Sequence, residues 1–415
     1  MSSITEKVIL HLTSLHDGGG GKITTDIHQY LLRLGYSSYV VFRGKRCLFP
    51  DGAINSVPQT QRYWWNKLRR FVFRWIAKHS SVDQNYSMYN LCERFTCYSA
   101  RDILSVLPQK PDTIFVHWVS DFANAEFIHD LRELTDAKIV FLLIDYALFS
   151  GGCHYQLDCQ NYRNGCHNCP ATSSWIVKKG IERNYAFKLR FLPKDIVINA
   201  NSFEKERLKS TKLYKNACFV SSIFPLDEKF FCPVKDKTAL RDKWELPKDK
   251  RVILVGSTFL NEKRKGLSLF VEALMKLSYR NFIVAIAGNQ ELPIKDGKAR
   301  VLGYLTEEEL IEAYQFSDVF VCPSIADAGP LMVKQACLCG TPIVAFPVGV
   351  SVDLVKTGET GYLAEYKNVD DLARGIDSVL SLSEEEWKVM SDKCRNKGLQ
   401  LCSLQTSSFK LEQVI

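Results

Sequence analysis

One stretch near the C-terminal end of the chain combines residue types that suit an anion-binding site. Asp327 follows an apolar run, Gly329 and Pro330 lie two and three residues after it, and Gln335 lies eight residues after it. Proline is favoured in the first turn of a helix, and the N-terminus of a helix attracts anions. Glycine lets a ligand approach the backbone closely. The pattern predicts Asp327 before a helix and Gln335 within it, so both side chains are candidate ligand contacts.

Two series of alternating strands and helices position this stretch, as expected for parallel α/β sheets. A chain of 415 residues suits two domains of roughly 200 residues each. In the first series, a glycine loop at residues 18–21 follows the first strand and precedes a helix. The expected strands of the first series are 7–12, 38–42, 113–118, 138–144 and 195–199. Those of the second are 251–256, 282–287, 318–322 and 341–346, with a helix at 267–277.

The composition is that of an ordinary soluble globular protein, with 46% hydrophobic and 24% charged residues. No apolar run reaches the roughly 18 residues of a membrane-spanning helix, and the N-terminus lacks a signal-peptide pattern. We therefore expect a cytoplasmic protein. The formal net charge of +8 favours anionic partners. The basic residues are spread out and no nucleic-acid-binding module is present, so nucleic acid is not an expected partner.

The Asp327 stretch resembles glycosyltransferase family 4, whose members are retaining enzymes of the GT-B fold. That family shows Glu-x7-Glu followed by Ala-x-Ala-x-Gly-x-Pro; here the frame is Asp327-x7-Gln335 followed by Ala336 to Pro342. Asp keeps the charge of the first Glu with a shorter reach, and the resemblance implies that it meets the donor sugar. Gln keeps an acceptor oxygen without the charge, and the resemblance implies that this oxygen binds the ribose hydroxyls. The resemblance implies an α/β protein of two Rossmann-like domains with an interdomain cleft.

The resemblance also assigns roles. Lys265, assisted by Arg264, matches a lysine that contacts the donor diphosphate, and His117 matches a position near the donor sugar. The implied catalytic residues are His117, Lys265 and Asp327. The implied donor-binding residues are Gly20, Gly21, Arg264, Lys265, Gly303, Tyr304, Asp327, Ala328, Gly329, Pro330, Leu331 and Gln335. Taken singly, the glycines also suit a flexible loop, His117 a structural histidine, and residues 263–265 a solvated basic run.

The implied domains are an N-terminal acceptor-side domain (1–222, with a Cys-rich insertion at 150–170), a linker (223–250) and a nucleotide-sugar-binding domain (251–395). A last segment, 396–415, is expected to pack back on the N-terminal domain. The implied function is transfer of a sugar from a nucleotide-sugar donor to a glycan or lipid-linked acceptor in cell-surface polysaccharide synthesis. Because the chain has no Asp-x-Asp, we expect no catalytic metal. The alternatives are a non-catalytic nucleotide-sugar-binding subunit and an epimerase or phosphorylase of the same architecture.

Four cysteines are unusually close together: Cys153, Cys159, Cys166 and Cys169. Closely spaced cysteines in a cytosolic protein are typical of a structural zinc site. This four-cysteine segment also resembles an insertion in bacterial colanic-acid-type glycosyltransferases. We interpret it as a zinc knuckle that orders a loop near the acceptor; the alternative is four reduced thiols in a loop.

Residues 62–79 show the pattern of a basic amphipathic helix. Trp64, Trp65 and Trp75 share one face with other apolar residues, whereas Lys67, Arg70, Arg74 and Lys78 recur on another. Such a helix suits a bilayer interface and would place the protein on the inner face of the membrane. The equally weighted alternative is a helix packed on its own domain with its basic side in solvent.

Overall fold

The computed structural model describes residues 7–14, 18–43, 53–54, 62–220, 223–257, 261–294, 297–404 and 414–415. The chain divides into two compact units. Unit 1 takes in residues 1–200, 205–221 and 411–415, and unit 2 takes in residues 201–204 and 222–410.

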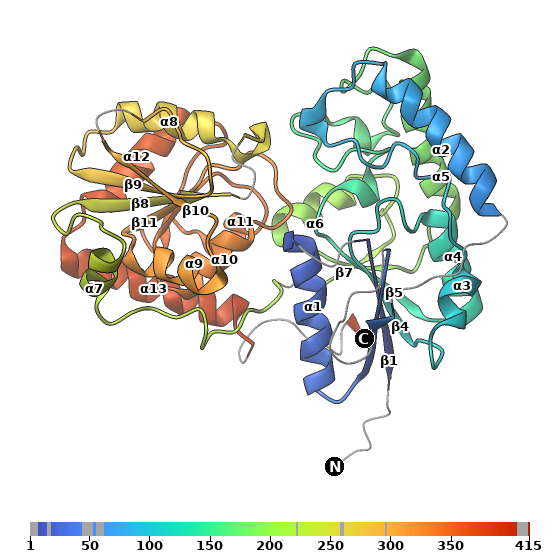
Figure 1. Ribbon diagram of the computed structural model, residues 1–415, viewed down its shortest axis with the longest axis horizontal. Coiled ribbons are helices and arrows are strands. Elements are labelled where there is room, and N and C mark those ends of the chain that lie inside the picture. The colour runs from blue at the N-terminus through green and yellow to red at the C-terminus, as the bar shows by residue number, and fades with distance from the viewer. Residues whose placement is uncertain are drawn as a thin grey trace. The chain divides into compact units, whose positions relative to one another are not determined.

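The elements up to residue 220 build a seven-stranded parallel sheet in the order β3-β2-β1-β4-β5-β6-β7. In Figure 1, α1 lies on one side of this sheet and α4 on the other. The elements are β1 (Val8–Thr13), α1 (Gly18–Arg33), β2 (Ser37–Phe42), β3 (Ala53–Ile54), α2 (Arg62–Lys78), η1 (Gln84–Tyr86), α3 (Ala100–Ser105), β4 (Thr113–Val116), α4 (Ala125–Thr135), β5 (Lys138–Leu142), η2 (Ala147–Phe149), η3 (Asn161–Arg163), α5 (Trp175–Phe191), β6 (Val197–Asn199), α6 (Ser202–Lys209) and β7 (Cys218–Val220).

Unit 2 contains a six-stranded parallel sheet in the order β10-β9-β8-β11-β12-β13. Figure 1 shows α8 and α12 over one face, and α9, α10 and α13 over the other. The elements are α7 (Lys237–Lys243), β8 (Arg251–Gly256), η4 (Lys263–Lys265), α8 (Leu267–Lys276), β9 (Phe282–Ala287), β10 (Ala299–Gly303), α9 (Glu307–Phe316), β11 (Val319–Cys322), α10 (Leu331–Leu338), β12 (Ile343–Ala345), α11 (Ser351–Leu354), β13 (Gly361–Leu363), α12 (Val369–Leu380) and α13 (Glu384–Cys402).

Local sequence explains these elements. The central strands are continuous apolar runs, such as Phe-Ile-Val-Ala-Ile-Ala in β9, and every residue of β9 is buried. Strands covered by helices on both faces require such runs. Capping boxes at Thr306 and Ser383 satisfy the first backbone N–H groups of α9 and α13. The nine strands expected from the sequence all form, with bounds that differ by a few residues.

Both sheets have the strand order of a Rossmann fold, so the predicted fold class is confirmed in each unit. In this strand order, the connection after the first strand crosses one face of the sheet, and the connection after the fourth strand crosses the opposite face. A crevice therefore opens beyond the carboxyl ends of β1 and β4 in unit 1, and of β8 and β11 in unit 2.

The segment expected to be a linker, 223–250, is part of unit 2. Ile223, Leu226, Phe231 and Leu246 belong to the buried apolar cluster of that unit. Within the same segment, α7 carries Lys237 and Arg241, which bond the buried carboxylate of Asp318 at 2.7 Å and 2.6 Å. The Pro, Lys and Asp content of residues 223–250 predicted a linker, but Lys237 and Arg241 of this segment pair with the buried Asp318.

The last segment divides between the units. Residues up to Cys402 continue α13 in unit 2, whereas the backbone oxygen of Ile415 accepts hydrogen bonds from Lys7 and Thr113 of unit 1, each at 3.4 Å.

The prediction of a glycine loop at residues 18–21 is wrong, because these glycines form the first turn of helix α1. The expected helix signal began only at Ile27, since glycine has a low intrinsic helix propensity. A Cβ on Gly20 would lie 3.7 Å from Ile144 and 3.9 Å from Trp118, an ordinary contact distance. The start of α1 therefore lies near the segments that follow β4 and β5, with room for a small side chain at Gly20.

Candidate functional site

In unit 2, the residues singled out from the sequence meet beyond the carboxyl ends of β8 and β11. The short helix η4, which follows β8, carries Arg264 and Lys265, and the loop after β11 carries Asp327. The Lys265 ammonium lies 2.8 Å from Oδ2 of Asp327, and the Arg264 guanidinium lies 3.2 Å from the same oxygen. Residues more than sixty positions apart thus form one charged cluster, which we call the Asp327 cluster.

Asp327 is ionised in this cluster. Burial opposes its charge, but the nearby charges of Lys265 and Arg264 outweigh burial, so the pKa of Asp327 lies below its usual value. Its second oxygen, Oδ1, accepts a hydrogen bond from the backbone N–H of Gly329 at 3.1 Å. The carboxylate is therefore held from both sides, and two cations lie together at a place where a parallel sheet binds ligands.

The backbone fixes the two halves of the Asp327 cluster to each other. The N–H of Ile325 donates to the carbonyl of Arg264 at 2.7 Å. Gly266, directly after η4, has a φ of +66°, and a Cβ there would lie 1.8 Å from the carbonyl oxygen of Pro323. No side chain fits in that space. Gly266 is therefore required both for its backbone conformation and for the close approach of the two segments.

The remaining predicted donor residues occupy distinct positions in unit 2. Pro330 is the N-cap of α10 and Leu331 its first residue, as expected from the sequence. The carbonyl of Ala328 accepts from Asn201 Nδ2 at 2.6 Å. Gly303 ends β10 with a φ of +80°, and the Tyr304 side chain that follows is largely exposed.

Gln335 is buried within α10, and its side-chain oxygen accepts a hydrogen bond from the Tyr314 hydroxyl at 3.0 Å. That oxygen is the atom assigned to a ribose. Its bond to Tyr314 links α10 to α9 inside unit 2.

In unit 1, His117 lies just beyond the end of β4 and is buried. Its Nε2 lies 2.9 Å from Nδ1 of His11 on β1. Burial lowers the pKa of His117 to about 3, so the imidazole is neutral at pH 7. Nδ1 of His117 has no hydrogen-bond partner within the described part of the chain.

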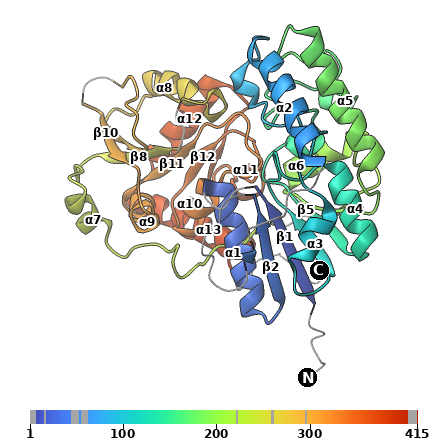
Figure 2. The same cartoon turned by 45° about the vertical axis from the view of Figure 1, so that its right-hand side comes forward.

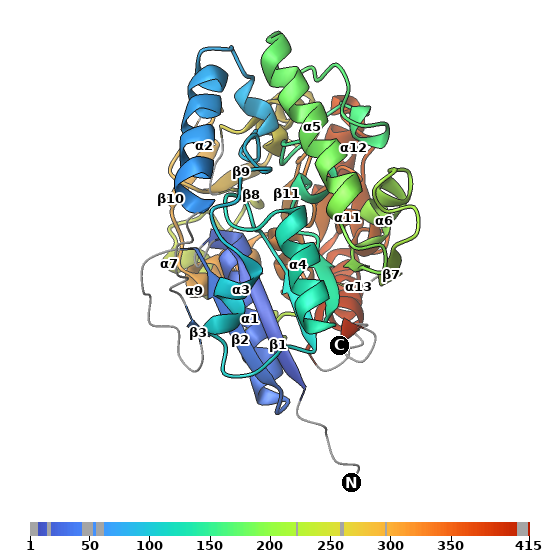
Figure 3. The same cartoon turned by 90° about the vertical axis from the view of Figure 1, so that its right-hand side faces the viewer.

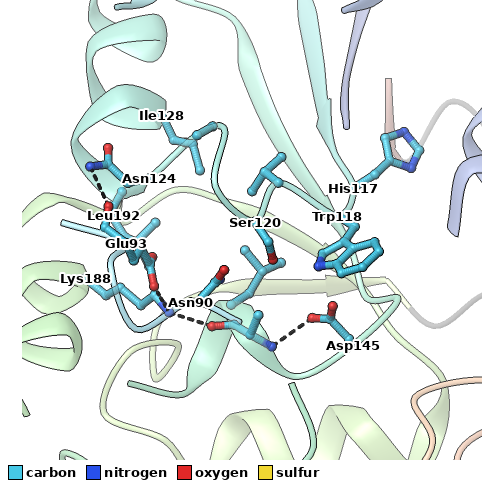
Figure 4. Close-up of a pocket in the computed structure, with 15 residues that line it drawn as sticks. Asn90, Glu93, His117, Trp118, Ser120, Asn124, Ile128, Asp145, Lys188 and Leu192 are labelled. Carbon is cyan, nitrogen blue, oxygen red and sulfur yellow. Dashed lines mark hydrogen bonds and ion pairs between the residues drawn. The ribbon is translucent and has the colours of Figure 1, made fainter. Parts of the chain in front are cut away.

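His117 also lines a small cavity (Figure 4). Trp118, Ser120 and Asp145 line the same cavity, together with a buried ion pair between Lys188 and Glu93 at 2.8 Å. Sequence reasoning singled out only His117 among these residues. The available signal was position, because Ser120 and Asp145 follow the adjacent strands β4 and β5, whose carboxyl ends meet at one edge of the sheet.

The structure matches the packed-helix alternative for α2 only in part, because the helix packs on unit 1 but its tryptophan face is exposed. Its basic residues Arg70 and Arg74 face unit 1, where both bond the carboxylate of Asp121. Trp64 and Trp65 are each 69% exposed, and Trp75 is 58% exposed. Figures 2 and 3 show α2 beside α5, and Phe73 fills the space over Gly180 of α5. The apolar face of α2 is therefore solvent-exposed, and part of its basic face is internal.

In the four-cysteine segment, three thiols are buried and Cys159 is partly buried. Burial raises the pKa of Cys166 to about 12 and raises that of Cys153 further. Across the described ranges, no three His, Cys, Asp or Glu side chains are arranged to hold a metal ion. The zinc knuckle stays a prediction.

Comparisons with known proteins find a family match in the C-terminal region. Residues 236–397 match the family model described as Glycosyl transferases group 1. Among curated relatives, the N,N'-diacetylbacillosaminyl-diphospho-undecaprenol alpha-1,3-N-acetylgalactosaminyltransferase of Campylobacter jejuni is 26% identical over 235 residues, covering 53% of this chain and 59% of that protein. The first three curated relatives are matched over 22% to 59% of their own length.

Solved structures resemble nearly the whole chain. Sucrose-phosphate synthase from Thermosynechococcus elongatus aligns with a TM-score of 0.65 at 16% identity, covering 98% of both chains. Anabaena Alr3699/HepE, in complex with UDP and glucose, aligns with a TM-score of 0.64 at 14% identity, also over 98% of both chains. These likenesses show the fold, which is the two-unit GT-B architecture. No helix in the described ranges is long and apolar enough to cross a bilayer.

Proposed function

We propose that this protein is a glycosyltransferase that moves a sugar from a nucleotide-sugar donor to an acceptor hydroxyl. The observation that carries the proposal is the Asp327 cluster, where Arg264 and Lys265 lie together at the ligand-binding edge of the unit 2 sheet. The cluster lies within the region that matches Glycosyl transferases group 1. The UDP bound to a protein of the same fold makes a nucleoside diphosphate the first ligand to test.

Each member of the cluster has a role in the proposed reaction. As the bond between the anomeric carbon and the phosphate oxygen breaks, negative charge grows on the diphosphate. The Lys265 and Arg264 cations stabilise that charge. Asp327 holds both cations in place and faces the sugar. By resemblance to family 4, the acceptor attacks from the face that the diphosphate leaves, the leaving phosphate takes the hydroxyl proton, and the anomeric configuration is retained.

The decisive experiment compares two neighbouring lysines of η4. Thermal stabilisation and slow donor hydrolysis are measured with UDP-, GDP-, ADP- and CMP-sugars. Lys265→Ala removes a charged contact to the diphosphate and is expected to weaken binding about 10- to 100-fold. Lys263→Ala is the matched control, because Lys263 lies two residues away with an exposed side chain. Equal affinities of the two variants would contradict the assignment of Lys265.

A non-catalytic nucleotide-sugar-binding subunit is the second candidate, because both acids of the family 4 frame are replaced, by Asp327 and Gln335. Asp327→Asn separates the two functions, because it removes the carboxylate charge but keeps the shape. In a transferase, this variant should keep nucleoside diphosphate binding and lose donor hydrolysis. Donor binding by the native protein without turnover, when glycan and lipid-linked acceptors are both supplied, would favour the binding subunit.

We further propose a lipid-linked acceptor, used in surface polysaccharide synthesis at an anionic membrane. The name of the Campylobacter jejuni relative includes a diphospho-undecaprenol acceptor. The exposed tryptophans of α2 and its exposed cations Lys67 and Arg69 supply the apolar and charged contacts that such a surface needs.

Sedimentation with phosphatidylglycerol-containing vesicles tests this membrane contact. Replacing Trp64, Trp65 and Trp75 together with Ala should abolish co-sedimentation. Met275→Ala removes an apolar side chain of unit 2 that is also 69% exposed, and it should have no effect. Co-sedimentation that survives the triple replacement would exclude this face of α2 as the contact.

A further inference from the structure

Three polar side chains of unit 1 form a hydrogen-bonded row that the proposed transfer reaction does not use. The Ser120 hydroxyl lies 3.0 Å from Nε2 of His154, and Nδ1 of His154 lies 2.7 Å from Oδ2 of Asp145. In the tautomer whose Nδ1–H donates to Asp145, Nε2 of His154 accepts the proton of Ser120. A hydroxyl, a base and an orienting carboxylate in this order are the arrangement that activates a serine nucleophile.

The surrounding structure holds this row in place. The ring of His154 packs edge-on against Tyr89 and Trp118, with centroid separations of 5.1 Å and 5.5 Å. The second oxygen of Asp145 accepts from the backbone N–H of Ala147 at 2.8 Å. Both the base and the carboxylate that orients it therefore have fixed positions, as an activated nucleophile requires.

Ser120, at the nucleophile end of the row, lines the unit 1 cavity. Asp145 and Trp118 also line the cavity, whereas His154 is not among its lining residues. Figure 4 shows the indole nitrogen of Trp118 and the hydroxyl of Ser120 directed to the same part of the cavity. The buried indole N–H has no hydrogen-bond partner among the described residues. An oxygen atom bound beside Ser120 would satisfy this donor, which otherwise stays desolvated and unpaired.

We propose that Ser120 is a catalytic nucleophile and that unit 1 hydrolyses small carboxylic esters, such as acetyl esters of sugar hydroxyls. Ser120 Oγ bonds to the ester carbonyl carbon while its proton passes to His154 Nε2. The Trp118 indole N–H stabilises the carbonyl oxygen as it becomes negative. The ester C–O bond then breaks, and the alcohol leaves with the proton from His154. A water molecule attacks the acyl-serine, gives its proton through His154 back to Ser120, and releases the acid.

The first test uses the unsubstituted 415-residue chain. A fluorophosphonate probe is added, and the modified residue is located by peptide mass mapping. We expect one adduct, on Ser120, and a protected Ser120 when 4-nitrophenyl acetate is present in excess. An adduct on another residue only, or no adduct, would overturn the proposal. This assay contains no nucleotide sugar, so its outcome is independent of the proposed transferase activity.

The second test compares two buried serines that both bond a histidine. Ser120→Ala should reduce 4-nitrophenyl acetate hydrolysis to the rate of buffer. Ser38 lies 2.8 Å from Nδ1 of His28 and does not line the cavity, so Ser38→Ala should leave the hydrolysis rate unchanged. Equal rates in the two variants would refute a nucleophilic role for Ser120.

Asp145 acts through His154, so its test must separate positioning from folding. Asp145→Asn keeps the volume of the side chain and should lower kcat by about 100-fold or more with little change in KM. Asp145→Glu should restore part of the lost rate. An unchanged kcat in Asp145→Asn, at an unchanged melting temperature, would show that the row is structural only.

Discussion

Gly266→Ala tests whether the close approach between η4 and the loop after β11 holds the Asp327 cluster together. Gly266 has a φ of +66°, and an added Cβ would lie 1.8 Å from the Pro323 carbonyl oxygen, where real Cβ atoms keep at least 3.0 Å. The two segments would have to separate by at least 1.2 Å. The left-handed backbone costs an alanine about 1 kcal/mol, and relieving the overlap costs roughly 2 kcal/mol more, as overpacking of a buried site does. We therefore expect unit 2 to lose about 3 kcal/mol of unfolding free energy, which lowers its Tm by about 6–12 °C.

Gly358→Ala supplies the matched control for this experiment. Gly358 lies in unit 2 with a φ of +77°, and nothing lies within 4 Å of the position of its Cβ. This variant has only the backbone cost, so its Tm should fall by about 2–4 °C. Scanning fluorimetry measures both shifts, and nucleotide affinity is measured well below both transitions. Gly266→Ala should also bind nucleotide more weakly, because Lys265 and Arg264 move away from Asp327. Equal Tm shifts in the two variants would refute the packing argument.

Three further predictions concern acid stability, a buried carboxylate and zinc. The pKa of His117 is lowered to about 3 by burial, so below pH 6.5 the unfolded chain binds a proton that the folded chain does not. Stability should therefore fall by up to about 1.4 kcal/mol per pH unit on acidification from pH 6.5, and urea titrations should find a smaller slope in His117→Gln. Asp318→Ala removes the buried carboxylate that pairs with Lys237, Arg241 and Arg251, and it should lower the free energy of unfolding in urea by about 3–5 kcal/mol. The control Asp370→Ala removes an exposed carboxylate and should lower it by about 0–1 kcal/mol. Elemental analysis of protein purified without chelators should find roughly one zinc per chain if the four-cysteine segment binds it, and Cys166→Ser should remove it; a metal content below about a tenth of that would exclude the zinc knuckle.

Local patterns determined the fold class and much of the candidate donor site. The apolar runs at β8, β9 and β11 predicted their strands because parallel strands are buried on both faces, so their hydrophobicity is continuous in the sequence. Asp327 and Pro330 marked the start of α10 for a similar reason, since the requirements of a helix N-terminus are met within a few adjacent residues. Strand order and the crevice at the carboxyl ends follow from the topology rules of such sheets.

Only the tertiary structure decided which side chains meet and which faces are covered. The partners of Asp327 are more than sixty residues away, and His154, which bonds Ser120, is 34 residues away from it in the sequence. The periodicity of α2 showed two faces but not which of them packs, because a basic face can pack on a domain when an acid such as Asp121 is present to pair with it. Residues 223–250 looked like a linker for the same reason, since Asp318 is distant in sequence from the cations that it binds. The local sequence shows which side chains are charged or apolar, whereas the tertiary structure decides which residue each charged side chain pairs with.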